Sequence, residues 1–70
     1  MVDRDDKFLR LPAVIEKTGC GRASIYRMIN AGVFPRQERI GARAVGWRLS
    51  AIARWMEAPA DYQEDRPAAG

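Results

Sequence analysis

The sequence predicts a small, mostly α-helical domain with one β-hairpin, in which the first two helices form a helix-turn-helix. Residues 18–28 contain the end of one short helix, a tight turn flanked by Gly19 and Gly21, and the start of a second helix. Residues 37–49 change to a strand-like alternation of apolar residues and arginines. A helical period returns from Ser50. We therefore expect the order helix, turn, helix, hairpin and closing helix.

The first helix is predicted to begin near Pro12, because a proline N–H is not needed in the first turn of a helix. A short extended piece over residues 8–11 precedes it, so Leu11 would be its N-cap, a poor one. The helix is expected to reach about Thr18. Gly19 then suits the left-handed conformation that ends many helices.

The second helix is predicted to start after Gly21 as its N-cap, to continue to about Ala31 and to stop at Gly32. Its apolar residues recur at helical spacing, which indicates one buried face: Ile25, Met28 and Ile29.

The hairpin is predicted from apolar residues that alternate with arginines, with a tip at residues 41–44: Ile40, Val45 and Trp47 against Arg39, Arg43 and Arg48. Two short strands are not stable alone, so this ribbon must lie on the helices.

The closing helix is predicted to start at Ser50 and to end before Pro59. Its apolar residues at i, i+3 and i+4 should complete the core: Ile52, Trp55 and Met56. Both tryptophans, Trp47 and Trp55, are expected in the core, because so small a domain can hardly leave either exposed.

Charge is distributed unevenly along the 70 residues, whose net charge is +3. Residues 7–58 carry ten lysines and arginines against three glutamates, whereas both ends are acidic overall. We expect residues 1–6 to be a flexible acidic tail, residues 7–58 to be the domain, and residues 59–70 to be disordered. A GC-rich genome could explain the high arginine content, but it does not explain why basic residues lie in the middle of the chain and acidic residues at its ends. A basic body between acidic ends favours a polyanionic partner.

The residue types argue against several other classes. Cys20 is the only cysteine and there is no histidine, so an intrachain disulfide is impossible and a zinc site has almost no ligands. The sequence has no glycine-rich phosphate loop, and the three carboxylates of residues 7–58 are scattered. No apolar run reaches the length of a membrane span. We therefore expect a cytoplasmic protein that is not an enzyme, with no cofactor, metal or small-molecule ligand.

The exposed side of the second helix is the first candidate nucleic-acid surface. It is expected to present five residues: Arg22, Ala23, Ser24, Tyr26 and Arg27. As a recognition helix, it would place Arg27 on a guanine edge or a phosphate and the Tyr26 hydroxyl on the DNA backbone. The alternative is an ordinary solvated helix face with Tyr26 half-buried.

The hairpin supplies the second candidate surface. Arg43 near the tip would reach a neighbouring minor groove or phosphate run, and Arg39 and Arg48 would hold the DNA backbone nearer the base. The alternative is that these arginines protect strand edges from unwanted pairing.

Several motifs in this order resemble the AlpA family of small phage and integrative-element regulators: Phe8-Leu-Arg-Leu-Pro12, Thr18-Gly19, Ser24-Ile-Tyr-Arg27, Phe34-Pro35 and Val45-Gly-Trp-Arg48. The likeness spans about residues 8–57. It implies a MerR-like, excisionase-like winged helix-turn-helix that binds double-stranded DNA, with the second helix in the major groove and the hairpin as the wing. Two positions depart from the family pattern: Gly21, where serine is usual, and Ala23, where a polar residue is common.

The resemblance implies a sequence-specific transcriptional regulator of a prophage or integrative element. One alternative is a recombination directionality factor that bends DNA, and another, from a different class, is a protein-interaction module. Because one copy contacts little DNA, side-by-side self-association on repeated sites is also expected.

Overall fold

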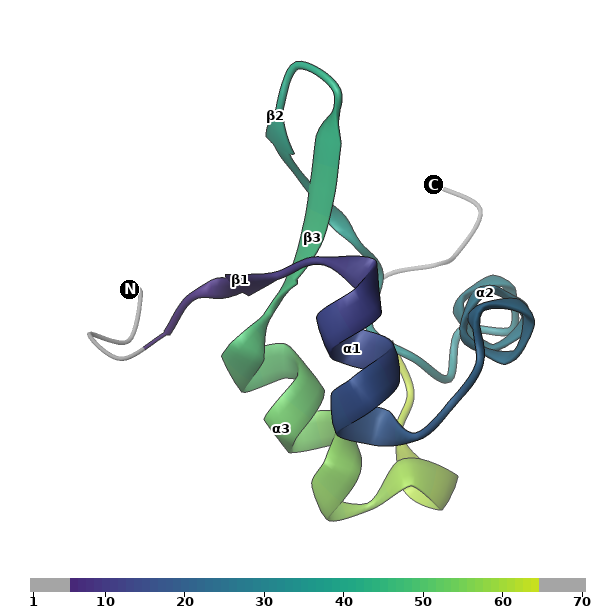
Figure 1. The fold of residues 1–70 in the computed structure, drawn as a ribbon. Helices are drawn as coiled ribbons and strands as arrows, with labels where there is room; N and C mark the ends of the chain where they lie inside the picture. Colours follow the sequence, from purple (N-terminus) through teal and green to yellow (C-terminus); the bar gives the residue numbers. More distant parts are fainter. Residues whose placement is uncertain (1–5, 65–70) are drawn as a thin grey trace.

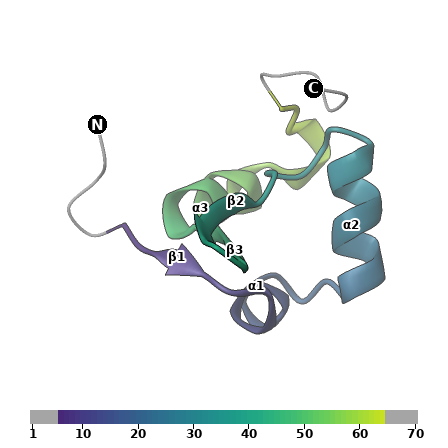
Figure 2. The ribbon, with the colours of Figure 1, turned by 90° about the horizontal axis from the view of Figure 1, so that it is seen from above.

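The computed structural model describes residues 6–64, and the remaining parts of the two predicted tails lie outside them. The elements follow one another as β1 (Phe8–Leu9), α1 (Leu11–Thr18), α2 (Arg22–Asn30), β2 (Glu38–Gly41), β3 (Ala44–Arg48), α3 (Leu49–Glu57) and the 3-10 helix η1 (Pro59–Asp61). In Figure 1 the β2–β3 hairpin projects away from α1 and α3, and α2 stands at one side of the fold. The view from above in Figure 2 places α2 at the same outer position. The predicted mostly helical fold with a helix-turn-helix and a wing is confirmed.

The sheet has a third strand that the sequence pattern did not predict. Strand β1 pairs antiparallel with β3, with Phe8 opposite Arg48 and Leu9 opposite Trp47, so the strand order is β1-β3-β2. The approach of β1 requires Gly46, because a Cβ atom there would lie 2.8 Å from the Leu9 carbonyl oxygen. The segment expected only as an extended piece therefore anchors the base of the wing.

One core lies between the sheet and the helices. Its buried apolar side chains come from every α-helix, from β1 and β3, and from the segment after α2: Leu9, Val14, Ile25, Ile29, Phe34, Trp47, Ile52 and Trp55. The prediction that both tryptophans are core residues is confirmed. The prediction for Met56 is wrong, since 41% of this residue is exposed. Ile52 and Trp55 occupy the inner side of α3, and Met56, one position on, turns toward solvent.

The turn between α1 and α2 has the predicted glycine geometry. Gly19 is left-handed with φ of 76°, and Gly21 is the extended residue before α2. The Thr18 hydroxyl donates to the Val14 carbonyl at 2.7 Å and accepts the Cys20 N–H at 3.2 Å. These bonds fix the angle at which α2 leaves α1.

Two helix starts differ from expectation by one residue. Helix α1 begins at Leu11 with Arg10 before it, and α3 begins at Leu49 rather than Ser50. Asp6 supplies the capping contacts near the start of α3, where its carboxylate accepts the Ser50 N–H at 2.9 Å and the Ser50 hydroxyl at 2.7 Å. Asp6 is thus tied to the domain and is not part of a free tail.

The chain after α3 also departs from the predicted disorder as far as Glu64. A 3-10 turn over Pro59–Asp61 redirects the backbone, and Tyr62 packs against the core. The Glu64 N–H then donates to the Gly32 carbonyl at 2.9 Å. Apolar burial of Tyr62 and these bonds offset the entropy of ordering, which composition alone could not indicate. Within residues 6–64, no helix is both long and apolar enough to cross a membrane.

Candidate nucleic-acid interface

Helix α2 divides into a buried side and an exposed side, as the sequence predicted. Ile25 is fully buried and Ile29 is 7% exposed, and both belong to the core. Arg22, Ala23 and Arg27 are exposed. The helix therefore presents two guanidinium groups and a small apolar residue to solvent at the edge of the fold (Figure 2).

Ser24 and Tyr26 are less accessible than predicted. Both are half-buried, and Tyr26 packs against the core. This position agrees with the alternative interpretation, in which Tyr26 is an aromatic residue at the edge of the core. Its hydroxyl as a contact to the DNA backbone remains a prediction.

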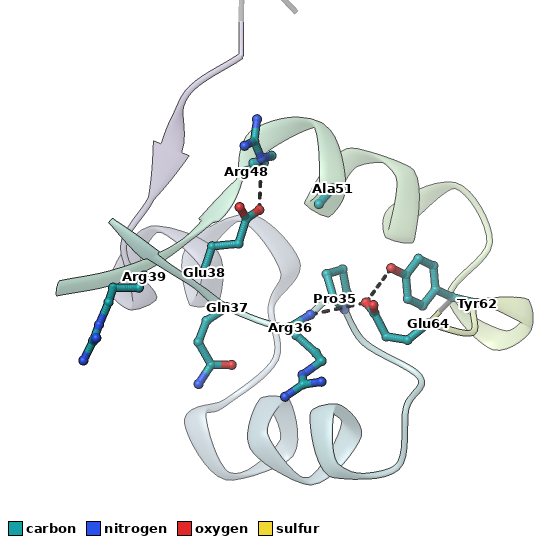
Figure 3. Close-up of a pocket in the computed structure, with 9 residues that line it drawn as sticks. All are labelled: Pro35, Arg36, Gln37, Glu38, Arg39, Arg48, Ala51, Tyr62 and Glu64. Atoms are coloured by element: carbon teal, nitrogen blue, oxygen red, sulfur yellow. Dashed lines mark hydrogen bonds and ion pairs between the residues drawn. The ribbon is translucent and has the colours of Figure 1, made fainter. Parts of the chain in front are cut away.

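The two faces of the wing carry different residues. Arg39 lies opposite Val45, so it shares the face of β3 that bears Val45 and Trp47. Glu38 lies opposite Gly46, so it shares the other face with Arg48. In Figure 3 Arg39 points to the side of the fold on which α2 lies, and Glu38 and Arg48 point the opposite way.

Arg43 lies in the turn between β2 and β3 and is exposed. The hairpin projects from the body (Figure 1), and Arg43 belongs to the turn that closes it. Arg22, Arg27, Arg39 and Arg43 are thus exposed cations distributed over α2 and the wing.

Arg48, the third predicted wing residue, is engaged at the base of the wing. Its Nε is 3.0 Å from the Glu38 carboxylate, and a second nitrogen is 4.0 Å from Asp6. Its guanidinium also lies over the Phe8 ring, 5.2 Å from the centroid. These contacts join β1, β2 and β3, and they favour a structural role for Arg48 over the predicted contact with DNA.

Two residues of the linker between α2 and β2 were not among the sequence-predicted candidates. Arg36 and Gln37 point to the same side as Arg39 in Figure 3. Arg36 is exposed and Gln37 is half-buried. The signal in the sequence was a short polar run after Pro35 that leads into Arg39, but it had no periodicity to distinguish it from an ordinary loop.

An open groove of about 710 Å³ lies beside this linker and is lined mainly by polar residues of the linker, β2 and the C-terminal segment (Figure 3). It contains the Glu38–Arg48 ion pair and the Tyr62–Glu64 hydrogen bond. Among residues 6–64, no cluster of side chains could hold a metal ion. The exposed arginines of α2 and the wing form the candidate interface.

The comparisons with known proteins show the family of the chain. The family described as prophage CP4-57 regulatory protein (AlpA) matches residues 7–59. The chain is similar to the DNA-binding transcriptional activator AlpA of Escherichia coli strain K12, with 41% identity over 56 residues that cover 71% of this chain and 80% of the relative.

A second relative comes from Enterobacteria phage P4. The chain is similar to its uncharacterized protein ORF88, with 39% identity over 51 residues that cover 73% of this chain and 58% of that protein. No solved structure matches the chain at a significant level. The resemblance predicted from the motifs is confirmed, and the chain belongs to the AlpA family of prophage regulatory proteins.

Proposed function

We propose that this chain is a DNA-binding transcriptional regulator of a prophage or integrative element, without catalytic activity of its own. The observation that carries the proposal is that α2 exposes Arg22 and Arg27 while the wing exposes Arg39 and Arg43. The printed name of the Escherichia coli relative, a DNA-binding transcriptional activator, supports the same function.

In the proposed complex, α2 enters the major groove and the wing follows the neighbouring backbone or minor groove. The exposed fork of Arg27 can bind guanine or a phosphate. Ala23 can offer no more than an apolar contact to a thymine methyl group. Arg43 at the turn of the wing suits a narrow minor groove, where the negative potential favours arginine.

One copy of so small a domain contacts little DNA, so we propose that copies bind side by side on repeated sites. A regulator of this kind acts in the bacterial cytoplasm, where the DNA is. Neither point affects the first test, which needs only the purified chain and defined duplexes.

That test is fluorescence anisotropy with two labelled duplexes, the DNA upstream of the chain's own gene and a scrambled control, at about 50 and 200 mM salt. A preference for the upstream duplex that persists at the higher salt is the expected result. Equal affinities that collapse with salt would indicate phosphate attraction alone and favour an architectural role in excision. The absence of binding to any duplex would contradict the proposal and favour a protein-interaction module.

A further inference from the structure

The linker between α2 and β2, residues 31–37, is held by the C-terminal segment at two points. At one end, the Glu64 N–H donates to the Gly32 carbonyl at 2.9 Å. At the other end, the Glu64 carboxylate accepts the Arg36 N–H at 3.3 Å. One residue therefore joins the end of α2 to the start of the wing.

The Glu64 carboxylate is itself held in place. The same oxygen, Oε2, accepts the Tyr62 hydroxyl at 2.7 Å, and Tyr62 packs against the core. Figure 3 shows the Tyr62 and Glu64 side chains pointing toward each other, on the opposite side of the groove from Glu38. The position of the carboxylate is thus set by Tyr62, which packs against the core.

The linker determines which residues reach the candidate interface. Gln37 and Arg39 point to the side on which α2 lies, and Glu38, between them, points away (Figure 3). Glu38 and Arg39 are held by their pairing with β3, but Gln37 precedes the paired residues, so a rotation of the backbone at Arg36 would turn Gln37 away from that side. The bond from the Arg36 N–H to Glu64 opposes that rotation.

We propose that Glu64 is a positioning residue for DNA binding, which fixes the α2–β2 linker so that Gln37 faces the DNA beside Arg39 and α2. This inference rests on the proposed function. It also makes Gln37 a contact to the DNA backbone or to a base edge, between those of α2 and the wing. Glu64 lies beyond residues 7–59, the part of the chain that matches the family.

Simple electrostatics predicts the opposite sign for Glu64. A carboxylate near a polyanion weakens binding, and its removal should then strengthen binding at low salt. Positioning predicts weaker binding after removal, because a mobile linker must be ordered again in the complex. The sign of the change therefore distinguishes the two effects.

The experiment measures the affinity of four chains for the upstream duplex at about 50 and 200 mM salt: the wild type, Glu64→Ala, Glu64→Gln and Asp61→Ala. Asp61 is the matched control, because it is an exposed carboxylate of the same segment and no described residue bonds to its side chain. We expect Glu64→Ala to bind about threefold to tenfold more weakly, the loss of one hydrogen-bond-sized contribution.

Glu64→Gln should bind like the wild type, because its amide oxygen still accepts both hydrogen bonds although the charge is gone. Asp61→Ala should bind as well as the wild type or more tightly. If Glu64→Ala instead binds as tightly as Asp61→Ala, or if Glu64→Gln loses as much as Glu64→Ala, the proposal is wrong.

A second measurement does not involve DNA. Amide hydrogen exchange at Arg36 should become faster in Glu64→Ala and stay unchanged in Glu64→Gln and Asp61→Ala. Unchanged exchange in Glu64→Ala overturns the positioning role even if no duplex binds. Failure of the positioning role is therefore distinguishable from failure of the proposed DNA binding. Should Glu64→Ala fold poorly, Tyr62→Phe keeps the packed ring and removes only the hydroxyl. It should bind DNA more weakly and exchange the Arg36 amide faster than the wild type, in both cases by less than Glu64→Ala.

Discussion

Trp47 and Trp55 donate their indole N–H groups to carbonyl oxygens of the same linker, Trp47 to Pro35 at 2.9 Å and Trp55 to Val33 at 3.0 Å. Phe34 lies between these two carbonyls, is fully buried, and meets the Trp55 ring edge-on with centroids 4.8 Å apart. The two tryptophans therefore do more than fill the core. Their polar atoms bind the backbone that joins the candidate recognition helix to the wing.

The Trp55→Phe substitution tests this second role. It retains an aromatic ring in the core but leaves the Val33 carbonyl without its donor, so we expect a loss of about 1–3 kcal/mol in the free energy of unfolding. Trp55→Ala removes the ring as well and should cost about 3–5 kcal/mol, enough to unfold so small a domain. Urea denaturation followed by circular dichroism measures both. A Phe variant as stable as the wild type would show that the indole bond contributes nothing.

The Gly46→Ala substitution tests the attachment of β1 to the wing. The new Cβ would lie 2.8 Å from the Leu9 carbonyl oxygen and 3.2 Å from the Ile40 Cδ1 atom. Because a backbone atom is the obstacle, β1 must shift, and we expect a loss of about 1–3 kcal/mol in the free energy of unfolding. Gly41→Ala is the control, since its Cβ would meet only the Ala44 Cβ at an ordinary 3.5 Å. Equal denaturation midpoints for the two variants would contradict this account.

Local patterns were sufficient to predict much of this fold. The turn glycines Gly19 and Gly21, the apolar side of α2 and the two core tryptophans each follow from spacing within a few residues. The prediction for Arg27 depends on the same periodicity, because it lies on the side of α2 opposite the buried Ile25 and Ile29. Arg22, three residues before Ile25, lies on the buried side by periodicity and is exposed as the first residue of the helix.

Most of the features that could not be predicted depend on contacts between distant parts of the chain. Three such contacts join residues that are far apart in sequence: the pairing of β1 with β3, the capping of α3 by Asp6, and the hydrogen bonds of Glu64 to the α2–β2 linker. Arg48 was predicted to contact DNA because its spacing matches the wing, but its pairing with Glu38 depends on the register of the hairpin. Composition also predicted disorder in the C-terminal segment, since nothing local indicates that Tyr62 packs on the core.

Asp6 should make the stability of the domain dependent on pH. Its hydrogen bonds, first from the Ser50 hydroxyl and then from the Ser50 N–H, lower the pKa of Asp6 below its ordinary value of 3.8. A group whose pKa is lower in the folded state stabilises the fold above the unfolded pKa, and this contribution is lost as the pH falls through the folded pKa. The wild type should therefore melt at a higher temperature than Asp6→Asn near neutral pH.

That difference in melting temperature should shrink as the pH falls below 3.8. Thermal melts of both chains from about pH 7 to about pH 2 measure it. A difference that stays constant over this range would mean that ionisation of Asp6 does not stabilise the domain.

Arg39 and Arg48 should separate into a DNA-binding and a structural residue, although both lie on the wing. Arg39→Ala should weaken DNA binding and leave the melting temperature unchanged, because Arg39 is exposed on the side of α2. Arg48→Ala should lower the free energy of unfolding by about 1 kcal/mol, since it removes partly exposed ion pairs and the contact with Phe8. Anisotropy titrations and urea melts of both variants measure these effects. If Arg48→Ala instead weakens DNA binding and leaves the stability unchanged, Arg48 is a DNA-binding residue.

Arg27 is the residue most suited to report whether α2 reads DNA sequence. If its guanidinium binds a base edge, Arg27→Ala should cost about 1–3 kcal/mol on the preferred duplex and less on a scrambled one. If it binds only phosphate, the cost should be equal on both duplexes. The slope of the logarithm of the affinity against the logarithm of the salt concentration should then decrease by about 1. Arg54→Ala is the matched control, because it removes the same charge from an exposed position on α3. Anisotropy titrations of both variants on both duplexes give the answer, and equal losses for Arg27→Ala and Arg54→Ala would leave α2 with no specific role.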